Sequence, residues 1–196
     1  MSAPRWRALA CAVLLAALPA CATVTLAPAG PYAVGGQSVT LGRSWSDISI
    51  LLPGRPKNVR LLTIDGPLLN RLYIVDGLAD GRALAGPAGK DPPTPRWRSD
   101  LSPGEQVEFV ADSVAAMGYQ RVETKDLRPA RVGGVDGLRF NIAAKTTGGL
   151  DISGVAQVAE SGGRLFLILF LAPTEHYFGA QEAEVEGIMS SARPGG

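Results

Sequence analysis

The chain has 196 residues, of which 46% are hydrophobic and 19% are charged, and its formal net charge at pH 7 is +1. This length is enough for one domain of common size, and the near-neutral charge excludes the basic surface of a nucleic-acid-binding protein. There are only two cysteines, Cys11 and Cys21, and the first lies in an apolar leader, so the fold cannot depend on a disulfide framework.

A short apolar segment opens the chain. Arg5 and Arg7 precede an uncharged, alanine- and leucine-rich run over residues 8–17, and Pro19 follows it. A signal peptide has an apolar run of about 7–15 residues, whereas a membrane-spanning helix needs roughly 20. We therefore predict that residues 1–20 are a cleaved signal peptide. Loss of its two arginines would change the formal net charge from +1 to −1.

The residues at the end of this leader resemble the lipobox of bacterial lipoproteins, in which a thiol that follows small residues receives a diacylglyceryl group. Leu18, Ala20 and Cys21 fit the pattern, whereas Pro19 departs from the usual small or hydroxylated residue. The resemblance implies lipidation of Cys21, and two or more acyl chains give stable membrane attachment. The alternative is an A-x-A cleavage site at residues 20–22, which would release a soluble protein.

The lipoprotein pattern also implies a location. In enteric bacteria, a residue other than Asp after the lipidated cysteine indicates the outer membrane, and here that residue is Ala22. We expect a lipid-anchored protein of the cell envelope, on the periplasmic face of the outer membrane. Residues 21–31 are small and contain Pro and Gly, which predicts a lipidated tether, with a strand at 23–26 as the alternative. Residues 32–193 are predicted to form a single α+β domain.

Alternation of apolar and polar residues predicts strands in the first half of this domain. Residues 38–41 and 48–52 alternate in this way. The apolar runs 59–65 and 68–75 are separated by Gly66-Pro67, which predicts a hairpin. In the second of these strands, the odd-numbered and the even-numbered positions are both apolar, so we expect both of its faces to be covered.

The least regular stretch is residues 79–100, which contains three glycines and four prolines. We expect a loop that ends near Arg96-Trp97-Arg98. An aromatic side chain between two arginines is a candidate recognition patch on a loop. The alternative is that Trp97 folds back on the core while Arg96 and Arg98 are solvated.

A capping box predicts the first helix. Ser102 can accept a bond from the backbone N–H of Glu105, the Glu105 side chain can return it, and Pro103 suits the first helical position. Apolar residues then recur at helical spacing from 107 to 117, and Gly118 provides a stop. This pattern predicts a helix with one face on a sheet.

The second half of the domain is predicted to be a meander of strands. Residues 119–132 are charged and suggest a solvated strand pair at a sheet edge, where charge blocks aggregation. Residues 138–144 and 152–158 alternate, with glycine-rich turns between the strands. Residues 165–171 are apolar at every position, which predicts a central strand buried on both faces. A last helix is predicted to begin at Pro173-Thr174.

This order of elements resembles the PsbP-like α/β/α sandwich. The resemblance lies in residues 135–140, 150–160, 164–171 and 173–191, and it extends over residues 34–193. It implies a largely antiparallel β-sheet flanked by two helices. It also implies a binding or assembly role, because such domains mostly dock on other proteins. No functional residue carries over, because no site motif of the family is matched.

Few residues suggest chemistry. His176 is the only histidine, and its position in the predicted last helix suits a surface or capping residue better than a catalytic one. Asp65, Asp76 and Asp80 would form a carboxylate site if the 68–75 strand folds back, but Asp at turns usually bonds to its own backbone. No motif for a nucleophile, a phosphate loop or a metal is present, so we expect no catalytic residue, metal or cofactor.

The leading hypothesis is therefore a non-enzymatic, lipid-anchored domain that binds or stabilises a cell-envelope protein. One alternative is a small-ligand-binding lipoprotein with an apolar cavity under the 79–100 loop. Another is a hydrolase with an unrecognised site, which would place His176 or the aspartates in a deep pocket. We expect membrane association only through the anchor, and no nucleic-acid partner.

Overall fold

The computed structural model describes residues 24–53, 57–84, 86 and 94–193. The predicted signal peptide and the predicted lipidation site, Cys21, lie outside these residues. Within the described part of the chain, no helix combines the length and the apolar character needed to cross a bilayer.

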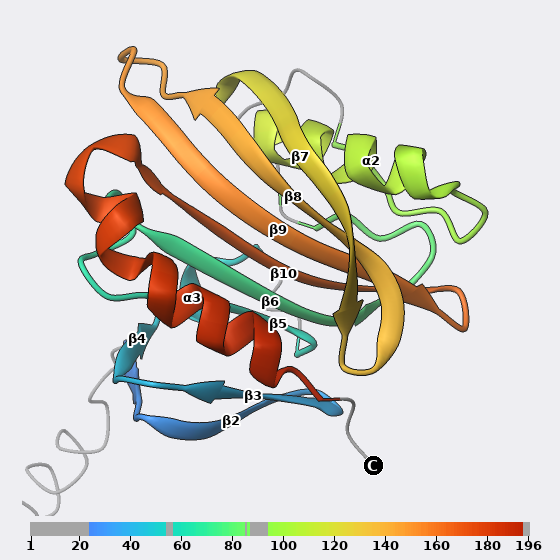
Figure 1. Ribbon diagram of the computed structural model, residues 1–196, viewed down its shortest axis with the longest axis horizontal. Helices are drawn as coiled ribbons and strands as arrows, with labels where there is room; N and C mark the ends of the chain where they lie inside the picture. Colours follow the sequence, from blue (N-terminus) through green and yellow to red (C-terminus); the bar gives the residue numbers. More distant parts are fainter. Residues whose placement is uncertain (1–23, 54–56, 85, 87–93, 194–196) are drawn as a thin grey trace, which may run out of the picture.

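One eight-stranded antiparallel sheet organises the fold (Figure 1). Its strands, in spatial order, are β1 (Thr25–Ala27), β4 (Trp45–Asp47), β5 (Val59–Thr63), β6 (Arg71–Leu78), β10 (Arg164–Pro173), β9 (Asp151–Ser161), β8 (Val135–Lys145) and β7 (Gln120–Val132). A separate two-stranded sheet consists of β2 (Gly30–Val34) and β3 (Gln37–Leu41). The predicted hairpin is confirmed, because β5 and β6 pair antiparallel.

Strand β10 lies centrally, as its sequence predicts. Leu165, Leu167 and Leu169 point into one core, whereas Ile168 and Phe170 point into the core on the opposite face. All five side chains are fully buried. Because burial of each such side chain contributes about 1.5–3 kcal/mol, this strand is a major source of stability for both cores.

Two helices cover opposite faces of the sheet, α2 (Pro103–Ala116) and α3 (Gly179–Ser191), as Figure 1 shows. The capping box is confirmed at α2, where both bonds between Ser102 and Glu105 form. Val110 and Val114 of α2 belong to one core, and α3 contributes to the other. The chain therefore has the predicted α+β fold, a largely antiparallel sheet between two helices.

The β2–β3 hairpin packs beside α3 and also contacts β6 of the main sheet (Figure 1). Glu184 of α3 accepts hydrogen bonds from Gly42 N and Trp45 Nε1, at 2.8 and 3.2 Å. The backbone N–H of Thr40 donates to Ser191 Oγ at 2.8 Å. The last helix is thus bonded to the hairpin while it packs in the same core as the main sheet.

The tether predicted over residues 21–31 is wrong for its described part. Thr25–Ala27 is strand β1, which pairs with β4, and β2 begins at Gly30. Ala27 is buried in the same core as α3. Burial of this alanine and pairing of the backbone tie the segment to the sheet, which matches the alternative of an N-terminal strand.

Three other elements differ from the prediction. The charged stretch 119–132 is one long strand, β7, with two register shifts and left-handed backbone at Arg121 and Asp126. The strand predicted over 48–52 is instead a 3-10 turn, η2 (Ser49–Leu51), because Asp47 Oδ1 accepts a bond from Ser49 N at 2.8 Å and ends β4. The last helix begins at Gly179, since a kinked segment, η3 (Thr174–Phe178), precedes it.

Candidate binding sites

Trp97 is the residue on which the predicted recognition patch depended, and it is 0% exposed. Its ring meets Phe109 of α2 edge-on, with centroids 5.6 Å apart, and its Nε1 donates to Gly163 O at 3.1 Å. Of the two interpretations of this segment, the structure matches the one in which Trp97 folds back on the core, and not an exposed aromatic patch. An indole with a satisfied N–H gains more from burial among the leucines and valines of the core than from solvent.

The two arginines beside Trp97 have different surroundings. Arg98 forms a bidentate ion pair with Asp100, at 3.0 and 2.9 Å, and these bonds hold the pKa of Asp100 below its ordinary value. Arg96 donates from Nη1 to Gly81 O at 2.8 Å and lines a pocket. Of the predicted patch, Arg96 lines this pocket, whereas Trp97 and Arg98 do not.

This pocket lies between β6, the 79–84 segment and residues 94–96, and it has a volume of about 630 Å³. Its apolar lining includes the buried side chains of Leu52, Leu78 and Leu84. Its charged lining consists of Arg82, Arg96, Arg164 and Asp76. The volume falls in the range of small-molecule sites, about 300–1,000 Å³.

A β-bulge in β6 shapes this pocket. Leu165 pairs with Leu78 and Leu167 with Val75, so that Phe166 alone faces both Asp76 and Gly77. Gly77 has a φ of +66°, a conformation that glycine adopts without strain. Its carbonyl accepts a bond from Arg164 Nη1 at 3.3 Å. The bulge thus fixes the side chain of Arg164 across β6, as bulges often do beside binding sites.

Arg82 and Arg164 could not be found from the sequence as site residues, because they lie 82 positions apart and no motif includes them. One local sign was available. A glycine inside a strand pattern often marks a bulge or a close approach of another group, and Gly77 is such a glycine.

A smaller apolar groove, of about 230 Å³, lies beside η2. Leu61, Tyr73 and Met117 line it, together with Leu51 and Pro67 at its border. Leu51 is 59% exposed, and Leu68, which follows Pro67, is 84% exposed. Large apolar side chains that are gathered and exposed mark interaction surfaces more often than scattered ones do.

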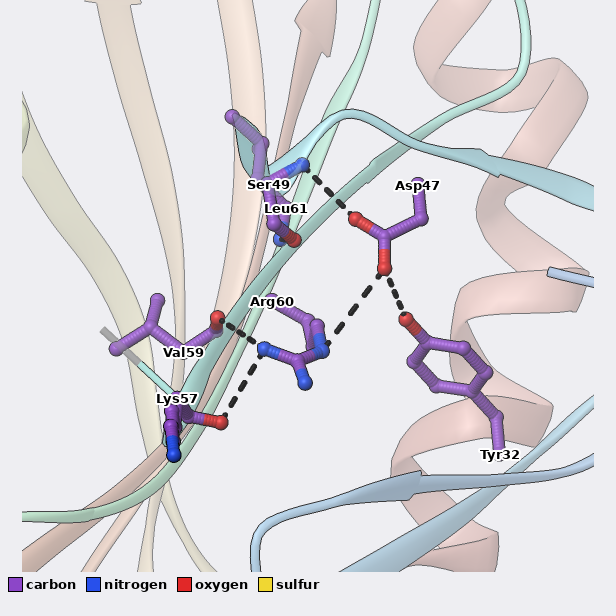
Figure 2. Close-up of polar contacts among 7 residues, drawn as sticks. All are labelled: Tyr32, Asp47, Ser49, Lys57, Val59, Arg60 and Leu61. Carbon is purple, nitrogen blue, oxygen red and sulfur yellow. Dashed lines mark hydrogen bonds and ion pairs between the residues drawn. The ribbon is translucent and has the colours of Figure 1, made fainter. Parts of the chain in front are cut away.

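A polar cluster joins the β2–β3 hairpin to the main sheet (Figure 2). Tyr32 donates to Asp47 Oδ2 at 2.7 Å, and Arg60 Nε lies 3.8 Å from the same oxygen. Burial first, and then the bond to Asp47, raise the pKa of Tyr32 above its ordinary value. A phenol that stays protonated at neutral pH serves here as a hydrogen-bond donor, so the cluster is a structural link between two sheets.

The three aspartates considered as a carboxylate site do not gather. Asp65 precedes β6 and accepts a bond from Asn70 Nδ2 at 2.6 Å, whereas Asp76 lies near the other end of β6. Asp76 and Asp80 accept backbone N–H groups, from Gly36 at 2.6 Å and Ser99 at 2.8 Å. Within the described ranges, no group of three or more His, Cys, Asp or Glu residues could hold a metal ion.

His176 lies in η3 rather than in the first turn of a regular helix, with a φ of +68°. Its side chain is exposed, and its ring meets that of Tyr177 edge-on at 5.1 Å. The deep pocket around His176 that the hydrolase hypothesis required is not found there.

No protein-family model matches the chain, and no curated protein matches it. Solved structures match over most of their length. Mog1p, a Ran-binding protein of Saccharomyces cerevisiae, is 10% identical, with a TM-score of 0.51 over 88% of this chain and 95% of that one. A mutant of Mog1 is also 10% identical, with a TM-score of 0.52 over 88% of this chain and 96% of that chain. CyanoP, the PsbP protein of the cyanobacterium Synechocystis, is 12% identical, with a TM-score of 0.51 over 92% of this chain and 99% of that chain.

These similarities establish the fold. The chain shares the architecture of PsbP and Mog1, which confirms the PsbP-like sandwich that the order of elements predicts. At 10–12% identity they show the fold and not the function.

Proposed function

We propose that this protein is a lipid-anchored, non-enzymatic domain of the bacterial cell envelope that binds or stabilises an envelope protein. The lipobox-like residues before Cys21 support the anchor. The shared fold supports a binding role by analogy, because one protein with this architecture is described as Ran-binding. The periplasmic face of the outer membrane is the location that this proposal assigns.

The observation that carries the binding role is the exposed apolar border of the groove beside η2. Leu51, which is 59% exposed, lines this groove, and Leu68, which is 84% exposed, follows Pro67 of its lining. The groove offers Tyr73 and Met117, an aromatic and a thioether side chain, to an inserted apolar residue. We assign this surface, rather than the segment around Trp97, to the envelope partner.

Site-specific photo-crosslinking in intact cells tests this role. A photoreactive amino acid is placed at Leu68, and at Leu150 as the matched control. Leu150 is also an exposed leucine, but it lies in the turn between β8 and β9. We expect one discrete cross-linked species of constant mass from position 68 and none from position 150. Equal labelling from both positions, or none from 68, would contradict the assignment.

The anchor is tested separately with Cys21→Ser. The wild-type protein is expected to partition with membranes and to carry the mass of acyl chains at its N-terminus. The variant is expected to lack that mass and to appear in the soluble fraction. A wild-type protein that begins at Thr23 without acyl mass would show instead that the A-x-A site is used.

A further inference from the structure

The arginine-lined pocket beside the β6 bulge has no part in the proposed docking surface or in the anchor. We propose that it binds an amphipathic anion, with a carboxylate or phosphate head at Arg82, Arg96 and Arg164 and an apolar body against the wall formed by Pro53, Ala79 and Ala83. This inference goes beyond the proposed function and does not depend on it.

The charge of the pocket is the first argument. Three guanidinium groups and one carboxylate line it. The carboxylate, Asp76, already accepts a bond from Gly36 N at 2.6 Å. Among the residues that the structure describes, none of the three arginines forms an ion pair, whereas Arg98 outside the pocket is paired with Asp100. A lining of this kind attracts an anion and repels a metal cation.

The second argument is the way two of these arginines are held. Arg96 donates one N–H to Gly81 O, and Arg164 donates one to Gly77 O. A guanidinium has five N–H donors in a rigid plane, so each arginine is positioned by one bond and keeps others for a ligand. The remaining donors match the oxygens of a carboxylate or phosphate, which arginine binds in bidentate fashion.

The apolar part of the lining determines the rest of the ligand. Leu52, Leu78 and Leu84 are buried members of the same core, and Pro53, Ala79 and Ala83 add further apolar surface. Because the three leucines are already buried, the apolar surface that a ligand can cover comes mainly from Pro53, Ala79 and Ala83. A bare inorganic anion would leave this surface against water. A ligand with several methylene groups next to its charged head would cover it, and burial of this surface favours binding. The pocket therefore fits an anionic amphiphile better than a free inorganic ion.

Binding is tested with octyl phosphate, using the full-length chain with Cys21→Ser so that no acyl chain competes. Inorganic phosphate supplies the head alone, and octanol supplies the body alone. Isothermal titration compares all three with the parent protein and with Arg96→Gln, Arg164→Gln and Arg98→Gln. Arg98 is the matched control, because it lies two residues from Arg96 but outside the pocket lining.

We expect octyl phosphate to bind at least tenfold more tightly than either inorganic phosphate or octanol. Its affinity should fall at least tenfold in Arg96→Gln and Arg164→Gln and stay within twofold in Arg98→Gln. Arg96→Lys, which keeps the charge but loses the planar donors, should be intermediate. Thermal unfolding of each variant checks that the fold is retained.

Three results would overturn the proposal: no binding of octyl phosphate to a folded protein, equal binding of octanol, or an equal loss of affinity in Arg98→Gln. The source of the anion is resolved by co-sedimentation with vesicles of phosphatidylglycerol or phosphatidylcholine. Binding to the former that depends on Arg96 identifies a lipid headgroup as the source. Binding of octyl phosphate without such sedimentation identifies a free amphiphile.

Discussion

Trp97 ties residues 94–100 to the core, and a substitution of this residue should lower the stability substantially. Its ring packs against Phe109 and its Nε1 donates to Gly163 O. Trp97→Ala is expected to lower the free energy of unfolding by about 3–5 kcal/mol, the usual cost of removing a buried aromatic ring. Trp97→Phe should cost less, because part of the ring contact survives. Denaturant unfolding measures both, and an alanine variant as stable as the parent would show that the ring is not packed.

Because of Tyr32, the free energy of unfolding is predicted to depend on pH in the alkaline range. Its phenol is held neutral by burial and by the bond to Asp47, so its pKa in the folded state exceeds the value of about 10 in the unfolded chain. The resulting stabilisation is complete below pH 10 and is lost as the pH rises through the folded-state pKa. Burial raises the pKa of Tyr73 and Tyr119 as well, which adds to the same loss.

The free energy of unfolding is therefore expected to fall as the pH increases above about 10. Tyr32→Phe should cost about 1.5–3 kcal/mol at pH 7, where it removes a hydrogen bond to a carboxylate. The same variant should lose stability less steeply at alkaline pH than the parent. Urea unfolding at pH 7 and at a series of alkaline values measures both effects, and parallel curves would refute the assignment to Tyr32.

At the scale of single elements, the N-terminus of α2 depends on its capping box. Ser102 Oγ accepts from Glu105 N, and the Glu105 carboxylate accepts from Ser102 N at 2.8 Å. Ser102→Ala is expected to lower the free energy of unfolding by about 1 kcal/mol. Ser99→Ala is the control, because only the backbone N–H of Ser99 is bonded, to Asp80. Equal losses in the two variants would mean that the cap does not stabilise the helix.

The elements that could be predicted are those with strong local patterns. The capping box marks the start of α2, and the apolar run 165–171 marks a strand buried on both faces. Short elements are harder to predict: β1 has three residues and its pairing with β4 is decided by packing, so the sequence offers this strand only as the alternative to a tether. The pocket could not be predicted from the sequence. It depends on a bulge at Gly77 and on arginines from distant parts of the chain, which only the completed sheet brings to one place.

At the scale of the whole molecule, the strand that replaces part of the predicted tether changes how the domain would lie on a membrane. If Cys21 carries the anchor, only four residue steps separate it from Thr25, where β1 begins. An extended chain reaches at most about 3.6 Å per residue, so β1 would lie within about 14 Å of the anchor. A flexible tether over all of residues 21–31 would have allowed roughly 36 Å.

The end of the sheet that carries β1 and β4 should therefore face the bilayer, with Leu26, 70% exposed, at its border. The β9–β10 turn lies at the opposite end of the long axis (Figure 1). A fluorophore is attached to Leu26→Cys or to Ser161→Cys in the lipidated protein, where acylation of Cys21 and loss of Cys11 with the leader leave no other thiol. Acceptor lipids should quench position 26 strongly and position 161 weakly. Equal quenching at both positions would show that the domain moves freely above the membrane despite its short connection.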